Sequence, residues 1–360
     1  MSRRSRTLLR EVIDSNHRKL NRISRFAPPK ANTLKYLQNE FRKTIPRPRY
    51  AFVTLVMCGD EYIKGALTLA WSLRQQKTQH ELIVMVTPDV SVSAMKLLRK
   101  LYDRVIKVQY IKTKVKSALR GKKYRKEDKW IEYSLTKARM LKLTEYDKVM
   151  WLDADSLVLN NIDELFEIQT PAGVCSSIRN HDYWHGSKIP ELEVENSVQN
   201  NYGVHGCTMV LTPNLDHYLL ASSLPQIGTA TNFVGPDEYF FTQLYKREWH
   251  HIHVKYACTK WFYEMRDVKP DVIHFSGDKP WEDEAEWEGV SVWRQAKEGL
   301  VRVCPKMSEL FVTQSQSSSQ RSQDEVKSSE DSKVSFRTQS SELTLKLTGV
   351  RSFQETLNKI

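Results

Sequence analysis

The amino-acid sequence predicts an α/β protein built on a doubly wound, mostly parallel sheet. Between residues 49 and 311, apolar segments of strand length alternate with segments of helical periodicity. The first expected strand, 51–57, is a continuous apolar run, which is typical of a parallel strand covered on both faces. In such sheets ligands bind beyond the carboxyl ends of the strands, so we expect the functional site there.

The expected elements follow in a β-α-β-α-β order. The first helix, 62–75, carries Ile63, Leu67, Ala70 and Leu73 at helical spacing. Strands are expected at 51–57, 81–87, 104–108 and 149–152, and helices at 62–75, 91–101 and 135–144. Residues 107–130 contain ten Lys/Arg and are expected to form a mobile loop near the mouth of the site.

Four regions divide the chain by composition. Residues 1–48 form a basic arm, expected to be flexible, because residues 1–50 hold fourteen Lys/Arg against three Asp/Glu, whereas the whole chain has a net charge of +12. Residues 49–311 are expected to form one catalytic domain. Residues 313–341, with eleven Ser and five Gln, are expected to be a disordered linker. Residues 342–360 regain apolar periodicity and form a short amphipathic segment.

Several classes of protein are disfavoured. No run of 18 apolar residues occurs, which argues against a transmembrane helix, and the basic start of the chain lacks the apolar core of a secretory signal. The five cysteines form no CxxC pair, so a disulfide framework or zinc ribbon is not expected and a cytoplasmic location fits best. Neither a Walker loop nor GxGxxG is present, which excludes P-loop NTPases and Rossmann dehydrogenases.

The sharpest motif is a pair of carboxylates at the end of an apolar strand. Asp153 and Asp155 directly follow the strand 149–152, and in an extended chain this spacing puts both side chains on one face. Two oxygen ligands suit a hard cation such as Mg²⁺ or Mn²⁺ and leave positions for phosphate oxygens. The alternative for Asp-x-Asp alone is an acidic turn that caps the following segment.

A second motif lies at 271–281. His274 follows a short apolar strand and could supply a nitrogen ligand to the same cation, although a histidine in this setting is more often part of a core. Gly277 allows the backbone to approach a phosphate, and Lys279 can neutralise its charge. Together with Asp153 and Asp155, these residues predict a metal–diphosphate site.

These motifs, in this order and spacing, resemble the glycogenin branch of the retaining glycosyltransferases. The likeness runs from about Tyr50 to Trp281. It is carried by Ala51-Phe-Val-Thr-Leu55, Tyr62-Ile-Lys-Gly65-Ala-Leu, Leu82-Ile-Val-Met-Val-Thr-Pro88-Asp-Val-Ser91, Leu135-Thr136-Lys137, Leu152-Asp-Ala-Asp-Ser-Leu-Val-Leu159-Asn-Asn-Ile-Asp163-Glu-Leu-Phe166 and His274-Phe-x-Gly277-x-Lys279-Pro-Trp281. The resemblance implies a GT-A fold that uses a UDP-sugar with manganese, or with magnesium as the alternative.

The resemblance also implies roles for individual residues. Leu55 and Tyr62 would hold the uracil and ribose, with the backbone of Ala154 near the ribose. Asp153, Asp155 and His274 would bind the metal, and Gly277 and Lys279 the diphosphate. Lys137 matches a lysine that the family needs for activity near the donor sugar. Asp237 would contact the transferred hexose.

The chain departs from the family where the sugar would bind. His205 replaces a sugar-contacting asparagine, Glu238 replaces a glutamine, and Val234 replaces an aspartate. These changes leave the identity of the donor sugar open. The interval between Asp237 and His274 is shorter than in glycogenin, so the portion with the self-glucosylated tyrosine is expected to be missing, and neither Tyr256 nor Tyr263 replaces that tyrosine convincingly.

The sequence therefore predicts a retaining hexosyltransferase that moves a hexose, glucose being favoured, from a UDP-sugar to a glycan or protein acceptor. Front-face attack is favoured over a covalent intermediate on Asp237. The alternatives are a catalytically silent scaffold and a nucleic-acid-binding protein, the latter disfavoured because residues 1–25 contain no aromatic side chain for base stacking. The C-terminal segment is expected to bind a protein partner or to pack on the catalytic domain. A homodimer stays open.

Overall fold

The computed structural model describes residues 48–113, 128–175, 185–199, 203–223, 235–266, 268–282 and 285–311. The basic arm predicted for residues 1–48, apart from Pro48, the linker predicted for 313–341 and the amphipathic segment predicted for 342–360 lie outside the described residues. So does most of the basic loop predicted for 107–130. These predictions stay untested by the structure.

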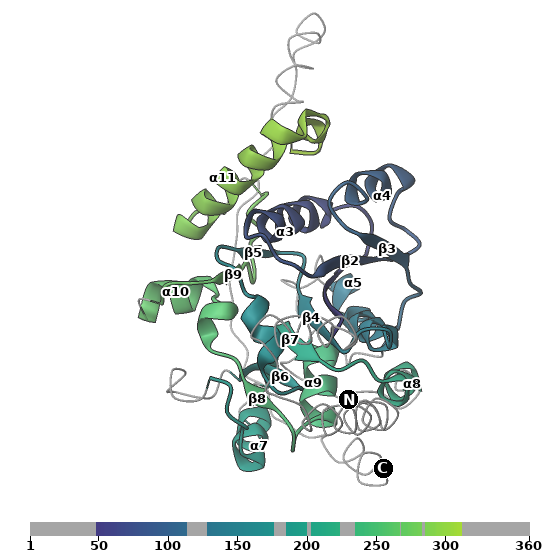
Figure 1. Ribbon diagram of the computed structural model, residues 1–360, viewed down its shortest axis with the longest axis vertical. Helices are drawn as coiled ribbons and strands as arrows, with labels where there is room; N and C mark the ends of the chain where they lie inside the picture. The colour runs from purple at the N-terminus through teal and green to yellow at the C-terminus, as the bar shows by residue number, and fades with distance from the viewer. Residues whose placement is uncertain are drawn as a thin grey trace, which may run out of the picture. The chain divides into compact units, whose positions relative to one another are not determined.

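A seven-stranded sheet forms the centre of the described chain (Figure 1). Its order is β3-β2-β1-β4-β7-β6-β8. The strands are β1 (Tyr50–Val56), β2 (Glu81–Val86), β3 (Arg104–Lys107), β4 (Lys148–Leu152), β6 (Ala172–Cys175), β7 (Val204–Leu211) and β8 (His250–His251). The four strands predicted from the apolar runs are all present in it.

The sheet is parallel in its first half and mixed in its second. β1 pairs in parallel with β2 and with β4, and β2 pairs in parallel with β3. β7 runs antiparallel to both β4 and β6, whereas β8 is parallel to β6. This arrangement, with Asp-x-Asp directly after β4, confirms the α/β class and the GT-A type of sheet that the resemblance implied.

Both faces of the sheet are covered, because side chains alternate along each strand. Phe52 and Val56 of β1 belong to one apolar core, and Ala51 and Val53 belong to the other. The first core includes α3 (Ile63–Gln75) and α4 (Val92–Leu98), and the second includes α8 (Leu215–Ser223) and α9 (Pro236–Leu244). Because each of these strands is buried on both faces, its sequence is a continuous apolar run.

The predicted helices differ from the observed ones at their ends and in type. α4 is shorter than predicted, and the Ser91 hydroxyl caps it by accepting a hydrogen bond from the Ala94 amide at 3.1 Å. The segment predicted as a helix over 135–144 is a 3₁₀ helix, η3 (Ser134–Lys142). Its tighter winding accompanies burial of seven of its nine residues, so packing from several sides overrides the local helical pattern.

A small second sheet lies beside the end of β4. β5 (Ser156–Val158) pairs antiparallel with β9 (Val272–His274), with Ser156 opposite His274. The remaining helices are α5 (Asp128–Ile131), η4 (Asp163–Glu167), α7 (Glu191–Gln199), η6 (Val254–Tyr256), α10 (Lys260–Arg266), α11 (Glu288–Val303) and η7 (Pro305–Phe311). The β5–β9 pair connects two distant parts of the sequence at the site described below.

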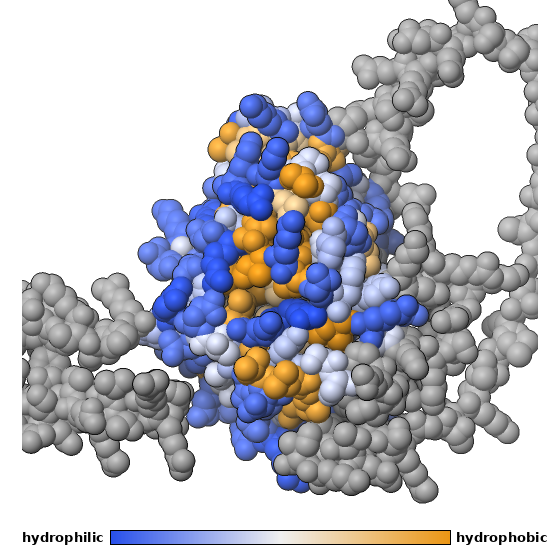
Figure 2. Space-filling view, turned by 90° about the vertical axis from the view of Figure 1, so that its right-hand side faces the viewer, coloured by the Kyte–Doolittle hydropathy of each residue, from blue (hydrophilic) through white to orange (hydrophobic). Residues whose placement is uncertain are grey.

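Polar side chains surround a band of apolar ones on the face shown in Figure 2. Large apolar side chains exposed on the described surface are Val92, Trp130, Leu192, Leu215, Leu219, Trp261 and Val303. Within the described ranges, no helix is both long and apolar enough to cross a membrane. None of the five cysteines is joined in a disulfide.

Candidate active site

The Asp-x-Asp motif forms a turn between β4 and β5. Asp153 follows the buried strand β4, and its amide donates a hydrogen bond to the Cys207 carbonyl of β7 at 3.0 Å. The two carboxylates converge, as predicted, but through this turn and not through an extended strand. The indole Nε1 of Trp151 donates to Asp153 Oδ1 at 2.7 Å and so fixes the orientation of that carboxylate.

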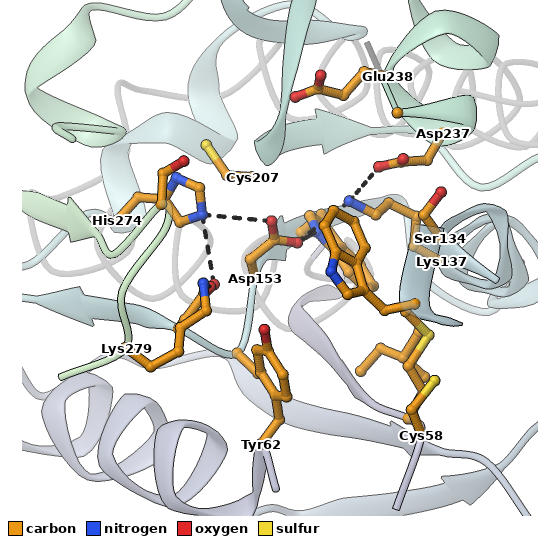
Figure 3. A pocket seen from close by; sticks show the side chains of 18 of the residues that line it. Cys58, Tyr62, Ser134, Lys137, Asp153, Cys207, Asp237, Glu238, His274 and Lys279 are labelled. Carbon is orange, nitrogen blue, oxygen red and sulfur yellow. Dashed lines mark hydrogen bonds and ion pairs between the residues drawn. The ribbon is translucent and has the colours of Figure 1, made fainter. Parts of the chain in front are cut away.

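The β5–β9 pair brings His274 to the same point. In Figure 3 its ring faces the Asp153 carboxylate and the end of Lys279. The imidazole Nε2 lies 3.7 Å from Asp153 Oδ2 and 3.5 Å from Asp155 Oδ1. Burial alone would lower the pKa of His274, but its neighbours Cys207 and Asp155 outweigh burial and raise that pKa well above its ordinary value. The predicted convergence of these three residues is therefore observed.

The donor set fits a divalent cation. One ligand atom from each of Asp153, Asp155 and His274 lies within 4.8 Å of the others. Two carboxylates and one imidazole suit a hard or borderline cation such as Mn²⁺, and three protein ligands leave positions open for phosphate oxygens. Binding would displace the proton from the imidazole, because only the neutral ring is a ligand.

Lys279 completes this half of the site. Its ammonium lies 2.7 Å from Asp155 Oδ2 and donates to the Phe275 carbonyl at 2.8 Å. Burial opposes ionisation of Asp155, but Lys279 and His274 outweigh it and hold the pKa of Asp155 well below its usual range. Gly277 has φ +90°, a conformation that favours glycine, and lines the same pocket as Lys279. The predicted diphosphate-binding residues thus lie next to the predicted metal ligands.

A second charged cluster lies on the other side of Asp153. Lys137, on η3, places its ammonium 2.5 Å from Asp237 Oδ2 and 3.3 Å from Asp153 Oδ1, and donates to the Gly206 carbonyl at 3.0 Å (Figure 3). Asp237 lies in the first turn of α9, where the positive end of the helix favours a carboxylate. Despite burial, these carboxylates raise the pKa of Lys137, and Lys137 lowers the pKa of Asp237.

Glu238 lies beside Asp237 and differs from it electrostatically. Its Oε1 accepts a hydrogen bond from the Gly206 amide at 2.9 Å. Burial and the negative charge of Asp237 raise the pKa of Glu238 to about 7, and the Gly206 amide only partly offsets this. At the position where the resemblance implied a glutamine, this chain therefore has a carboxyl group whose pKa lies near neutral pH.

These groups line one pocket of about 660 Å³, a size that suits a small organic ligand. Leu55, Tyr62 and Ala154 line it as well, where the resemblance placed uridine. The Tyr62 ring packs edge-on against Trp281 at 5.4 Å, and burial raises the pKa of Tyr62. Leu55 and Tyr62 give this part of the pocket apolar and aromatic surface, with Glu61 also in the lining and the Lys279 ammonium 5.7 Å from the centroid of the Tyr62 ring.

Gly65 on α3 has a packing role that the sequence did not reveal. A Cβ at this position would meet the backbone oxygen of Ala154 and the ring of Trp281. Only glycine therefore lets the helix approach the Asp-x-Asp turn so closely.

One predicted residue is not brought to the pocket, and several lining residues were not predicted. His205 lies on β7 next to Gly206 but is not among the side chains that line the pocket, so its proposed sugar contact gains no support. The lining residues missed by the sequence are Met57, Cys58, Glu61, Trp130, Ser134, Trp151, Cys207, Gly235 and Ser276. Nearness to a predicted site residue was the available local signal: Met57, Glu61, Trp151, Cys207, Gly235 and Ser276 each lie within two residues of one, whereas Cys58, Trp130 and Ser134 lie farther away.

Comparison with known families gives the same assignment. Residues 53–285, well over half of the chain, match the family described as glycosyl transferase family 8. The chain belongs to glycosyl transferase family 8. Within this family it is glycogenin-like: human Glycogenin-1 is 44% identical over 117 residues, which cover 32% of this chain and 32% of the human protein.

Other relatives cover more of this family 8 chain at lower identity. Uncharacterized protein R707 of Acanthamoeba polyphaga mimivirus is 27% identical over 64% of this chain and 82% of its own length. UDP-glucuronate:xylan alpha-glucuronosyltransferase 2 of Arabidopsis thaliana is 26% identical over 65% of this chain and 36% of its own. The matched region thus covers about a third of the length of Glycogenin-1 and of the glucuronosyltransferase. Among solved structures, the galactosyltransferase LgtC, in complex with donor and acceptor sugar analogs, is 14% identical over 69% of this chain and 95% of its own, with a TM-score of 0.47.

Proposed function

We propose that this glycosyltransferase moves a hexose, glucose being favoured, from a UDP-sugar to a glycan or protein acceptor with retention of configuration. The observation that carries the proposal is the convergence of Asp153, Asp155, His274 and Lys279 in one pocket with the Lys137–Asp237 pair. A silent scaffold would have no physical need for these buried charges, which are costly to desolvate. Five cysteines that form no disulfide support a reducing location such as the cytoplasm.

The two halves of the pocket suit the two halves of the donor. Asp153, Asp155 and His274 would hold Mn²⁺, which when bound supplies positive charge to the leaving diphosphate. Lys279 can pair with the same diphosphate, because its ammonium already points at an anionic neighbour. Lys137 and Asp237 would then face the hexose, where they can bind and orient its hydroxyl groups.

The environment of Asp237 favours front-face attack. Asp237 is 3% exposed, and its Oδ2 is tied to Lys137 at 2.5 Å. A carboxylate that is already paired and desolvated in this way is a weaker nucleophile, since attack would first require its separation from the ammonium. In front-face attack the leaving phosphate oxygen takes the acceptor proton, and no covalent intermediate on the protein forms.

The test is UDP release from a panel of donors. The full chain is incubated in manganese buffer with one donor at a time: UDP-glucose, UDP-galactose or UDP-glucuronate. Each reaction is run with and without oligosaccharide acceptors, and NMR gives the configuration of the product. We expect one donor to dominate, retention of configuration and loss of activity in Asp155→Asn. The matched control is Asp216→Asn, which removes an exposed carboxylate on α8. Inversion, or equal turnover in both variants, would contradict the proposal.

A further inference from the structure

Trp130 is an exposed aromatic side chain in the wall of the pocket. It lies on the short helix α5, is 39% exposed and lines the pocket together with the donor-binding residues. By contrast, Trp151, Trp249 and Trp293 are fully buried. A large indole surface open to solvent at a ligand site is a contact surface for a further molecule, because its burial would be strongly favourable.

The position of Trp130 in the chain places it at the hexose end of the site. The Tyr133 amide donates to the Trp130 carbonyl at 3.0 Å, so the turn of α5 continues directly into η3. Ser134, the first residue of η3, lines the pocket, and Lys137, which is paired with Asp237, follows three residues later. The diphosphate-binding groups Gly277 and Lys279 come instead from the segment after β9.

We propose that Trp130 forms an acceptor subsite on which a sugar ring of an oligosaccharide stacks. Pyranose rings present a face of C–H groups, and such a face packs on an aromatic ring while the hydroxyl groups at its edge remain in water. The donor hexose would be held by the charged groups, and the exposed indole in the pocket wall would hold the acceptor ring. This inference rests on the proposed glycosyl transfer and specifies that the acceptor is a carbohydrate.

The test compares Trp130→Ala, Trp130→Phe and Trp261→Ala in the full chain. Trp261 is a matched control, because it is 53% exposed on α10 and does not line the pocket. Three quantities are measured: the Kd of UDP with manganese, UDP-sugar hydrolysis without acceptor, and the Kd of maltotriose and of xylotriose in the presence of UDP. Thermal melting confirms that each variant is folded.

We expect Trp130→Ala to weaken binding of the better oligosaccharide about 10-fold, whereas the Kd of UDP and the hydrolysis rate change less than about twofold. Trp130→Phe should retain part of the affinity, and Trp261→Ala should match the wild type. An equal loss of UDP affinity would show that the indole covers the nucleotide and would overturn the proposal. Failure of the wild type to bind either oligosaccharide, which is the result expected for a protein acceptor, would also overturn the proposal. A wild type that binds oligosaccharide but not UDP would instead overturn the proposed function.

Discussion

Lys137 Nζ lies 2.5 Å from Asp237 Oδ2, although the side chains are only 9% and 4% exposed. The same ammonium reaches Asp153 Oδ1 at 3.3 Å, so one lysine connects the proposed metal ligand to the proposed sugar-binding carboxylate. The ammonium also lies over the indole ring of Trp151, 5.3 Å from the centroid of that ring. A buried charge in such a position is stable only while its partners remain, which links the stability of the site to its function.

Replacement of Lys137 should damage both stability and turnover. Lys137→Ala leaves Asp237 and Asp153 without their shared cation, and breaking a buried pair costs about 3 kcal/mol or more. We expect a melting temperature several degrees lower and loss of transfer. The control is Lys142→Ala, an exposed lysine on the same 3₁₀ helix.

The double variant Lys137→Met with Asp237→Asn separates these two effects. It removes both buried charges, so melting should return toward the wild-type value while transfer stays absent. Wild-type melting and turnover in Lys137→Ala alone would show that the buried pair has neither role.

Loss of any metal ligand should abolish metal-dependent transfer. Asp153→Asn, Asp155→Asn and His274→Ala should each weaken manganese binding, measured by calorimetry, and reduce turnover at least about 100-fold, since each removes one of three protein ligands. Chelator should stop the wild-type reaction and added manganese should restore it. Near-normal turnover of any one variant at saturating manganese would exclude that residue as a ligand.

The stability of the chain should depend on pH through Glu238. The pKa of this carboxyl is raised in the folded state from an ordinary 4.5 to about 7, mainly by burial and Asp237, with a smaller contribution from Asp153. The folded chain therefore binds the proton more tightly than the unfolded chain. The resulting stability is fully present below about pH 4.5 and is lost as pH rises through about 7.

Glu238→Gln removes this titration but keeps an oxygen that can accept the Gly206 amide. The melting temperature of the variant relative to wild type should therefore rise between pH 5 and pH 8, by roughly 2–5 °C. Glu298→Gln, on the exposed side of α11, is the control and should show no such trend. A difference that is independent of pH would mean that Glu238 is ionised throughout.

Self-glucosylation should be weak or absent. The interval between Asp237 and His274 is short. Tyr256 is 2% exposed with its hydroxyl donating to Glu164, and Tyr263 is half-buried with its ring packed against Trp287 at 5.6 Å. Intact mass after incubation with UDP-glucose and manganese is the measurement. Successive additions of about 162 Da on a tyrosine would contradict this prediction and identify the chain's own acceptor.

Truncation after Thr313 tests the role predicted for the C-terminal segment. Val350, Phe353, Leu357 and Ile360 have the spacing of one helical stripe, and so short a helix needs a surface on which to pack. If that surface belongs to a partner, truncation should leave melting and transfer to a small acceptor unchanged while the partner is lost. A melting temperature several degrees lower would show instead that the segment packs on the catalytic domain.

The sequence alone was sufficient to predict the features that depend on the pattern of neighbouring residues. The apolar runs of β1, β2 and β4 predicted buried strands, because burial on both faces selects such runs. Asp153 and Asp155 directly follow one of these runs, so the edge of the sheet could be named as the metal site. The type of η3 could not be predicted, since its tight winding depends on neighbours distant in sequence.

Tertiary structure decided which of the predicted site residues lie close to one another. Pairing of β5 with β9 sets Ser156 opposite His274, and this register puts the imidazole beside both carboxylates. The same holds for Lys137, whose partners Asp237 and Gly206 come from α9 and β7. Local periodicity reports only which face of its own element a side chain occupies, whereas these contacts depend on which elements pack against each other.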